Sequence, residues 1–233
     1  VWANTWVGET RGGLAGSGDL PNLYGCAYLG QCGVTVPGTD NHFIYVQQPT
    51  ALVSFNDFTR EYGLPNPVFT FSVSGAILGD SAANVASGTG TTTATIGSNV
   101  GLYPITGNFT SAAGYRIQFD PGTLSITPAT LLFTADSFVR YLGTQNPLFT
   151  GEVTGFRNGD TVQSVFGSGV IWSSPAGLLS PIGFYPVNGG TSATNYVFAQ
   201  APGNATALQI IPLPQLSSTP IDLIRETVNT YVY

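Results

Sequence analysis

The chain has 233 residues and a formal net charge of −6, and only 8% of its residues are charged, against roughly 25% in typical domains. A negative chain without clustered Lys and Arg is not expected to bind nucleic acid, because phosphate binding requires such clusters. A hydrophobic share of 42% excludes wholesale disorder. No apolar run reaches the roughly 18 residues of a membrane span. No basic-then-apolar signal peptide opens the chain, so we expect any export signal to lie outside it.

Residues 1–48 are predicted to form a small β segment that precedes the rest of the fold. Val1–Val7 alternates between apolar and polar residues, and His42–Val46 is a second apolar run, so both are expected to be strands. The chain has two cysteines, Cys26 and Cys32, whose close spacing favours a local disulfide over reduced thiols or a metal site.

Residues 49–128 and 129–212 form a tandem repeat. The stretch Asn66–Thr70 (Asn-Pro-Val-Phe-Thr) returns 80 residues later as Asn146–Thr150 (Asn-Pro-Leu-Phe-Thr). The later stretch Gly101–Ile105 returns 82 residues on, which indicates small insertions in the second copy, as loops tolerate. Short runs of β-branched and aromatic residues between Gly and Pro are typical of an all-β chain.

Each copy predicts the same order of elements. In the first repeat we expect strands at 51–55, 69–73, 91–96, 102–105, 115–119 and 124–126. Pro104 should lie at an edge or a strand end, because proline cannot donate to a β ladder. The residues after Gly79-Asp80 are expected to form one short helical turn capped near Asp80. In the second repeat the corresponding strands lie around 149–153, 170–172, 196–198 and 207–211.

The tail, residues 213–233, is ambiguous. Thr219-Pro220 resembles a helix start, whereas Thr227–Tyr233 alternates like a strand. A free terminal strand could pair with the sheet edge of another chain, so self-association through this strand is one alternative for the function.

On these residues each copy resembles the MBG domain (YGX type). The first copy carries Arg60–Phe69 (Arg-Glu-Tyr-Gly-Leu-Pro-Asn-Pro-Val-Phe), close to the family's Arg-x-Tyr-Gly-x-x-Asn-Pro-x-Phe opening, and Gly122–Pro128 is similar to its ending. The second copy departs at Leu142, where the family has Tyr, although Tyr141 is adjacent. The repeat residues expected to be structural are Gly63, Asn66, Pro67, Gly79, Asp80, Gly143, Asn146, Pro147, Gly159 and Asp160.

The resemblance implies a secreted or cell-surface bacterial protein of the filamentous haemagglutinin-like kind, exported by an outer-membrane secretion partner. It implies two sandwich-like β modules, with a β-grasp variant as the alternative fold, and a first segment that ends an upstream β-helix. The function it implies is a stalk or spacer that presents adhesive regions for attachment or biofilm formation.

No catalytic set is apparent, so we expect no enzyme. Nucleophilic catalysis needs a base beside Ser or Cys, and the one histidine, His42, lies in a strand-like run. Asp57 and Glu61 lie on one loop, where paired acids are usually solvated. No cofactor is expected. Calcium stays open as an alternative in an acidic extracellular chain, although no EF-hand pattern occurs.

Aromatic residues supply the candidate ligand-binding positions. Rings that stack on sugars would make the chain a carbohydrate- or mucin-binding module, with a host or matrix glycan or protein, or a biofilm polysaccharide, as the partner. The alternative for most of these rings is core packing. The candidate residues are Trp2, Trp6, Tyr24, Tyr28 and Trp172.

Overall fold

The computed structural model describes residues 1–190 and 192–215, which form two compact units. The first unit contains Val1–Leu131, Gly155–Gly167 and Ser192–Val197, so it includes the N-terminal segment, the first repeat and three short pieces of the second repeat. The second unit contains the other described residues. The predicted terminal helix start or strand lies outside the described residues.

The N-terminal segment is a small parallel sheet in the order β1-β3-β2, made of β1 (Trp2–Ala3), β2 (Asn22–Tyr24) and β3 (Phe43–Tyr45). The strand expected over Val1–Val7 has only two residues. The Val7 amide donates to Thr5 Oγ1 at 3.1 Å, a local bond that competes with the β ladder. The predicted disulfide between Cys26 and Cys32 is confirmed, and Cys26 packs in a small core with Leu23 and Ile44.

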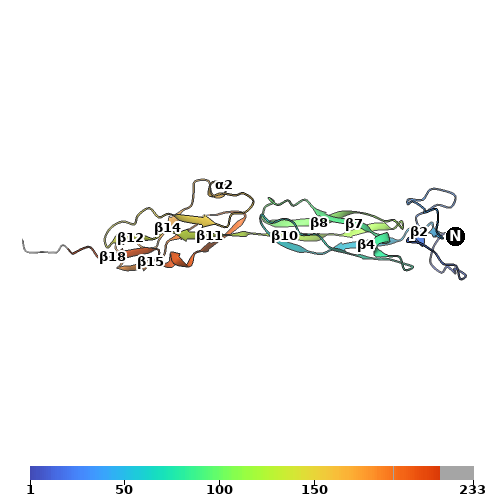
Figure 1. Cartoon of the computed structure of the whole chain (residues 1–233), viewed down its shortest axis with the longest axis horizontal. Helices are drawn as coiled ribbons and strands as arrows, with labels where there is room; N and C mark the ends of the chain where they lie inside the picture. Colours follow the sequence, from blue (N-terminus) through green and yellow to red (C-terminus); the bar gives the residue numbers. More distant parts are fainter. Residues whose placement is uncertain (191, 216–233) are drawn as a thin grey trace, which may run out of the picture. The chain divides into compact units, whose positions relative to one another are not determined.

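The first repeat consists of two sheets. One has the order β6-β4-β9 and the other β5-β10-β8-β7, and β4, β7, β8 and β10 can be followed in Figure 1. The strands are β4 (Thr50–Phe55), β5 (Phe58–Glu61), β6 (Phe71–Ser74), β7 (Ser87–Thr92), β8 (Gly101–Thr110), β9 (Arg116–Asp120) and β10 (Gly122–Thr127).

Two strand pairs of the first repeat pass from one sheet to the other. β4 leads directly into β5, and β9 leads directly into β10. β4 pairs with β9 in parallel, and β5 pairs with β10 in parallel, whereas the other pairings are antiparallel. The first and last strands of the repeat therefore lie side by side in both sheets.

Pro104 lies in an inner strand, although an edge or strand end was expected. β8 pairs with β10 on one side and β7 on the other, but the pairing with β7 ends at Thr92↔Ile105. Pro104 is one residue beyond that end and has a partner, Thr123, on one side only. The missing amide therefore costs no ladder bond to β7.

Aromatic rings packed over glycines fill the core of the first repeat. Phe55 makes edge-on contacts with Phe71 and Phe109 at centroid distances of 5.9 Å. A Cβ added to Gly90 would lie 2.9 Å from the Phe55 ring, and one added to Gly107 would lie 3.1 Å from it. The glycines of β7 and β8 thus provide the space that the phenyl ring occupies.

The second repeat has the same order of strands, which confirms the predicted all-β fold. Its sheets have the orders β13-β11-β17, β12-β18-β15 and β14-β16, and β12 and β18 are parallel. The elements are β11 (Ala129–Ala135), β12 (Phe138–Tyr141), β13 (Gly151–Thr154), β14 (Trp172–Ser173), β15 (Gly183–Tyr185), β16 (Asn188–Gly189), β17 (Tyr196–Gln200), the 3-10 helix η1 (Pro202–Thr206) and β18 (Leu208–Ile211).

A short helix follows the Gly-Asp pair in both repeats, as predicted. α1 (Ala82–Val85) is capped by Ser81 and α2 (Val162–Phe166) by Thr161, so the cap is the residue after each aspartate. Helices of four and five residues are too short to cross a sheet. The structure therefore lacks the long helix of the β-grasp alternative within the described residues.

Candidate functional site

The most elaborate polar site is built around Asp80, and we call it the Asp80 cluster (Asn22, Tyr24, Asp80 and Tyr115). Asp80 Oδ1 accepts a hydrogen bond from Asn22 Nδ2 at 2.7 Å. Asp80 Oδ2 accepts the hydroxyls of Tyr24 at 2.8 Å and Tyr115 at 2.7 Å. Asn22 and Tyr24 come from β2 of the N-terminal segment, so this carboxylate holds the segment against the first repeat.

A tight turn places the Asp80 side chain. The turn runs from Ile77 to Asp80, whose amide donates to the Ile77 carbonyl at 3.0 Å. Its two central residues, Leu78 and Gly79, have positive φ values of 53° and 80°, as in a type I′ turn. The Ile77 amide donates to the Tyr115 hydroxyl at 3.0 Å, which orients that hydroxyl toward the carboxylate.

The second repeat contains the same arrangement, the Asp160 cluster (Tyr62, Asp160 and Tyr196), which lies within the first unit. Asp160 Oδ2 accepts the hydroxyls of Tyr62 at 3.0 Å and Tyr196 at 2.6 Å. The Arg157 amide donates to the Tyr196 hydroxyl at 3.0 Å, as Ile77 does in the first repeat. Tyr62 comes from the end of β5 of the first repeat, so again a preceding segment supplies the phenol.

The two clusters share ring geometry as well as hydrogen bonds. Tyr24 and Tyr115 meet edge-on with centroids 5.0 Å apart, and Tyr62 and Tyr196 meet edge-on at 5.4 Å. Edge-on aromatic pairs add roughly 0.5–1.5 kcal/mol beyond their buried area. Each cluster is therefore a tyrosine that inserts into an aspartate–tyrosine pair of the following segment.

The environment keeps the phenols of Tyr24, Tyr115 and Tyr196 protonated. Burial, followed by the hydrogen bond to Asp80, raises the pKa of Tyr24 and Tyr115 well above the usual value of about 10. Burial and the bond to Asp160 raise the pKa of Tyr196 in the same way. A protonated phenol can donate to a carboxylate, whereas a phenolate would repel it.

Further contacts accompany the Asp160 cluster within the first unit. Arg157 forms an ion pair with Glu61 at 3.1 Å. Asn195 Nδ2 donates to Asn99 Oδ1 at 2.9 Å, and Asn195 Oδ1 accepts the Val100 amide at 3.0 Å. A cavity of about 220 Å³ lies beside the cluster, lined by Tyr62, Asn99, Asp160, Ser164, Val165, Thr194, Asn195 and Tyr196.

The Asn-Pro signature is explained by a buried arginine. Arg60 donates to Asn66 Oδ1 at 2.8 Å and to the Thr95 carbonyl at 2.6 Å, and Asn66 Nδ2 donates to the Ala94 carbonyl at 2.7 Å. The second repeat contains equivalent bonds around Arg140. Burial lowers the pKa of Arg60. Arg60 thus holds together two loop ends next to Tyr62, and Arg140 does the same next to Leu142, which occupies the equivalent position.

The N-terminal segment has its own polar network beside the Asp80 cluster. Arg11 binds Glu9 at 2.5 Å, Asn22 at 2.9 Å and the Tyr45 hydroxyl at 2.9 Å. The guanidinium also lies 4.0 Å from the centre of the Phe43 ring. Burial, together with a hydrogen bond to Glu9, raises the pKa of Tyr45 to about 12. This network holds Asn22 in place to donate to Asp80.

The structure divides the predicted ligand-binding aromatics into three groups. Trp2 and Tyr28 meet edge-on at 5.8 Å, and both are exposed. Trp6 lies in an internal ring cluster with Tyr24, which is 0% exposed and therefore offers no face to a ligand. Trp172 packs edge-on against Phe133 in the second unit, at 5.9 Å. Only Trp2 and Tyr28 form an accessible pair.

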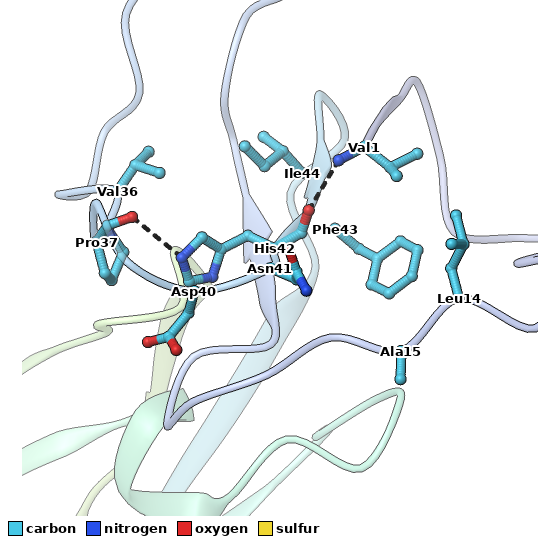
Figure 2. Close-up of a pocket in the computed structure, with 10 residues that line it drawn as sticks. All are labelled: Val1, Leu14, Ala15, Val36, Pro37, Asp40, Asn41, His42, Phe43 and Ile44. Carbon is cyan, nitrogen blue, oxygen red and sulfur yellow. Dashed lines mark hydrogen bonds between the residues drawn. The ribbon is translucent and has the colours of Figure 1, made fainter.

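A cavity of about 420 Å³ lies beside His42 (Figure 2). Its walls are Val1, Leu14, Ala15, Val36, Pro37, Asp40, Asn41, His42, Phe43 and Ile44. The His42 ring nitrogens lie 2.7 Å from the Leu20 carbonyl and 3.1 Å from the Pro37 carbonyl, so both are engaged with the backbone. Among these described lining residues there is no Ser, Thr or Cys for His42 to activate.

The described part of the chain has neither a cluster of metal-ligand side chains nor a helix that could span a membrane. Within residues 1–190 and 192–215, no three His, Cys, Asp or Glu side chains gather in a way that could hold a metal ion. In the same ranges, no helix has the length and apolar character needed to cross a membrane.

Sequence reasoning singled out Asp80 and Asp160 but not their partners. Both aspartates end tight turns, as assigned, and their side chains in addition accept tyrosine hydroxyls. The tyrosines Tyr115 and Tyr196 recur at nearly the same spacing from their aspartates, 35 and 36 residues. This recurring spacing was the signal in the sequence that could have identified the two tyrosines as partners of the aspartates.

Comparison with known families agrees with the tandem repeat. The model of the MBG domain (YGX type) matches residues 51–125 and 131–206. Each match begins close to the first strand of a repeat and includes its Gly-Asp turn. A search of curated proteins finds no match for this chain.

Proposed function

The chain belongs to the MBG domain (YGX type) family, and on this premise we propose that it is a non-enzymatic spacer of a secreted bacterial cell-surface adhesin. In this role the repeats present adhesive regions for attachment or biofilm formation. An outer-membrane secretion partner would export the parent protein. The chain itself then needs no catalytic site and no cofactor.

The recurrence of the tyrosine–aspartate contact is the observation that carries this proposal. The N-terminal segment inserts Tyr24 into the Asp80 cluster, and the first repeat inserts Tyr62 into the Asp160 cluster. Both contacts bind one segment to the next by side chains that are already satisfied internally. Such groups are suited to fixing a neighbour and leave little chemistry for a substrate.

The composition supports the same role. With 8% charged residues and six basic residues that are all Arg, the chain has few groups that could bind a charged partner. The ion pair of the N-terminal segment, between Arg11 and Glu9, is used internally. A surface with few charged groups suits a spacer domain between other domains.

Small-angle scattering of the chain tests the spacer. A spacer should give the same scattering profile at every protein concentration and with or without calcium. The Tyr62→Phe variant should broaden the distance distribution, since it removes one contact between the first repeat and the Asp160 turn within the first unit, while Tyr28→Phe should not. Compaction by calcium would contradict the proposal, and growth with concentration would favour a fibre subunit that donates its terminal strand.

Carbohydrate or mucin binding is the second candidate function, favoured by the exposed pair of Trp2 and Tyr28. Their rings project from β1 and from the disulfide loop, and stacking on sugars uses such accessible faces. A glycan array decides between the candidates. Binding that is lost in Trp2→Ala but kept in Trp172→Phe would establish a glycan site. An array without signal would rule out this candidate and favour the spacer function.

A further inference from the structure

One end of the first repeat is covered by polar contacts. Tyr62 donates to Asp160, Glu61 pairs with Arg157, and Asn99 accepts from Asn195. All of these residues lie in the first unit. The end therefore shows which groups this kind of module uses to receive another module's loops.

The second repeat has an equivalent end, and internal hydrogen bonds define the correspondence. Arg60 binds the Thr95 carbonyl, and Arg140 binds the Gly177 carbonyl, both beside an Asn-Pro loop. Tyr62 then corresponds to Leu142, 80 residues later. The loop after Thr95 corresponds to the loop after Gly177, 82 residues later.

The residues at this second end, which we call the open end, are more apolar than those at the equivalent positions of the first end. Glu61 and Tyr62 are replaced by Tyr141 and Leu142, and residues Gly97, Asn99 and Val100 by Leu179, Pro181 and Ile182. Leu179 is 86% exposed and Ile182 is 54% exposed. The Arg140 bonds to the Tyr141 and Gly177 carbonyls hold the two loops together. Exposed apolar side chains on two loops held together in this way mark a candidate interaction site.

Hydrogen bonding disfavours the docking of a loop end like that of the second repeat at the open end. Leu142 has no hydroxyl to donate to an aspartate at the Asp160 position, so that carboxylate would lose a hydrogen bond on docking. Tyr141 has no charge to pair with an arginine at the Arg157 position.

Sterics add a second, weaker preference. A Cβ added to Gly97 would lie 3.0 Å from Asn158 Nδ2. Leucine occupies this position in the open end, as Leu179. An asparagine at the Asn158 position would therefore have to turn its side chain aside to approach the open end. An occupant that is small there and apolar at the Asp160 position fits best.

We propose that the open end docks the loop end of a further β module of this family that is apolar at the Asp160 position and small at the Asn158 position, and that residue 142 selects it. Tyrosine at this position (Tyr62 in the first repeat) favours a module with a carboxylate at the Asp160 position, and leucine favours a module without one. The position thus determines which modules can be neighbours. The docking does not depend on the spacer role.

The test inserts a second copy of residues 129–212 between Pro212 and Leu213 of the full chain. One version of the inserted copy is unchanged. The other carries Asn158→Gly, Asp160→Ala and Tyr196→Phe. The third substitution removes the Tyr196 hydroxyl, whose acceptor is lost in Asp160→Ala. Each version is combined with Leu142 or with Leu142→Tyr in the original module.

The readout is the maleimide reaction rate of a cysteine introduced as Leu179→Cys. The native cysteines do not interfere, because both are in the disulfide. With Leu142 and the changed copy, we expect labelling at least tenfold slower than in the chain without insertion. With Leu142→Tyr, we expect slow labelling of Leu179→Cys when the inserted copy is unchanged, and not when it carries the three substitutions. A matched cysteine at Ile171, which is exposed but outside the open end, should react at one rate throughout.

Equal labelling of Leu179→Cys with and without an insertion would overturn the docking, and slowing that ignores residue 142 would overturn the selection. A second measurement uses the chain without insertion. Tyr62→Leu gives the first repeat the residue that the open end has at the equivalent position, Leu142. Its denaturant midpoint should fall, and adding Asp160→Ala should recover part of the loss. Additive losses in the double variant would refute the selection rule even if every insertion misfolds.

Discussion

Removing one hydroxyl from the Asp80 cluster should destabilise the first unit. Tyr24→Phe keeps the ring and its contact with Tyr115 but deletes the donor to Asp80 Oδ2, which it approaches at 2.8 Å. Asp80 is only 9% exposed, so water cannot easily replace the donor. A hydrogen bond to a charged group contributes about 1.5–3 kcal/mol. We therefore expect a loss of about 2 kcal/mol, or about 4–8 °C in Tm for a unit of this size.

The equivalent change in the Asp160 cluster should cost less. Asp160 is half-buried and borders a cavity of about 220 Å³, so a water molecule can take the place of the Tyr62 hydroxyl. Tyr62→Phe is expected to cost about 0.5–1 kcal/mol, near the value for an ordinary hydrogen bond. Tyr28→Phe serves as the control, since this side chain is 68% exposed and its change should stay within about 0.5 kcal/mol.

Urea unfolding followed by tryptophan fluorescence measures all three variants, since Trp6 reports from beside Tyr24. The m value should stay constant, so that the midpoint alone carries the change. If Tyr24→Phe unfolds at the wild-type midpoint, or if Tyr62→Phe is the more costly change, the assignment of Asp80 as the buried anchor is wrong.

Three further predictions concern other features. Because the pKa of the tyrosines around Asp80 is raised, their stabilising effect is complete below the unfolded-state pKa of about 10 and is lost as the pH rises above it. Tm measured from pH 8 to 12 should therefore stay level at first and then fall. A fall that begins at pH 8 would contradict this. Reducing the disulfide between Cys26 and Cys32 opens a loop of seven residues and should cost about 2 kcal/mol, with faster hydrogen exchange confined to residues 1–48. Gly151→Ala places a Cβ 2.5 Å from the neighbouring indole ring and should cost about 1–3 kcal/mol in unfolding experiments, whereas Gly177→Ala, which meets open space, should be close to neutral.

Local patterns were sufficient to predict most of the fold. Alternation over Ala51–Phe55 located β4 correctly, because a half-buried strand must place its apolar residues with period two. The strand predicted from the β-branched run at 91–96 was misplaced, since β7 spans Ser87–Thr92. The short helix after Gly79-Asp80 followed from capping residues alone. These features depend on neighbours within a few residues, and such dependence is visible in a sequence.

The clusters could not be predicted because their partners are far apart in the chain. Tyr24 and Asp80 are separated by 56 residues, and Tyr62 and Asp160 by 98. No periodicity joins positions so distant. The Val1–Val7 strand failed for a related reason, since alternation ignores the Thr5 hydroxyl that captures a backbone amide.

The parallel pairing of first and last strands has a mechanical consequence. In the first repeat the chain enters through β4 and leaves through β10, and these strands belong to the parallel pairs β4–β9 and β5–β10. A pull on the two ends of the repeat draws the partners of each pair along each other in opposite directions. Every hydrogen bond of the two ladders is then strained together, in shear, and none can be opened ahead of the rest as in a zipper. The repeat should therefore resist tension far more strongly along the chain than its thermal stability alone suggests.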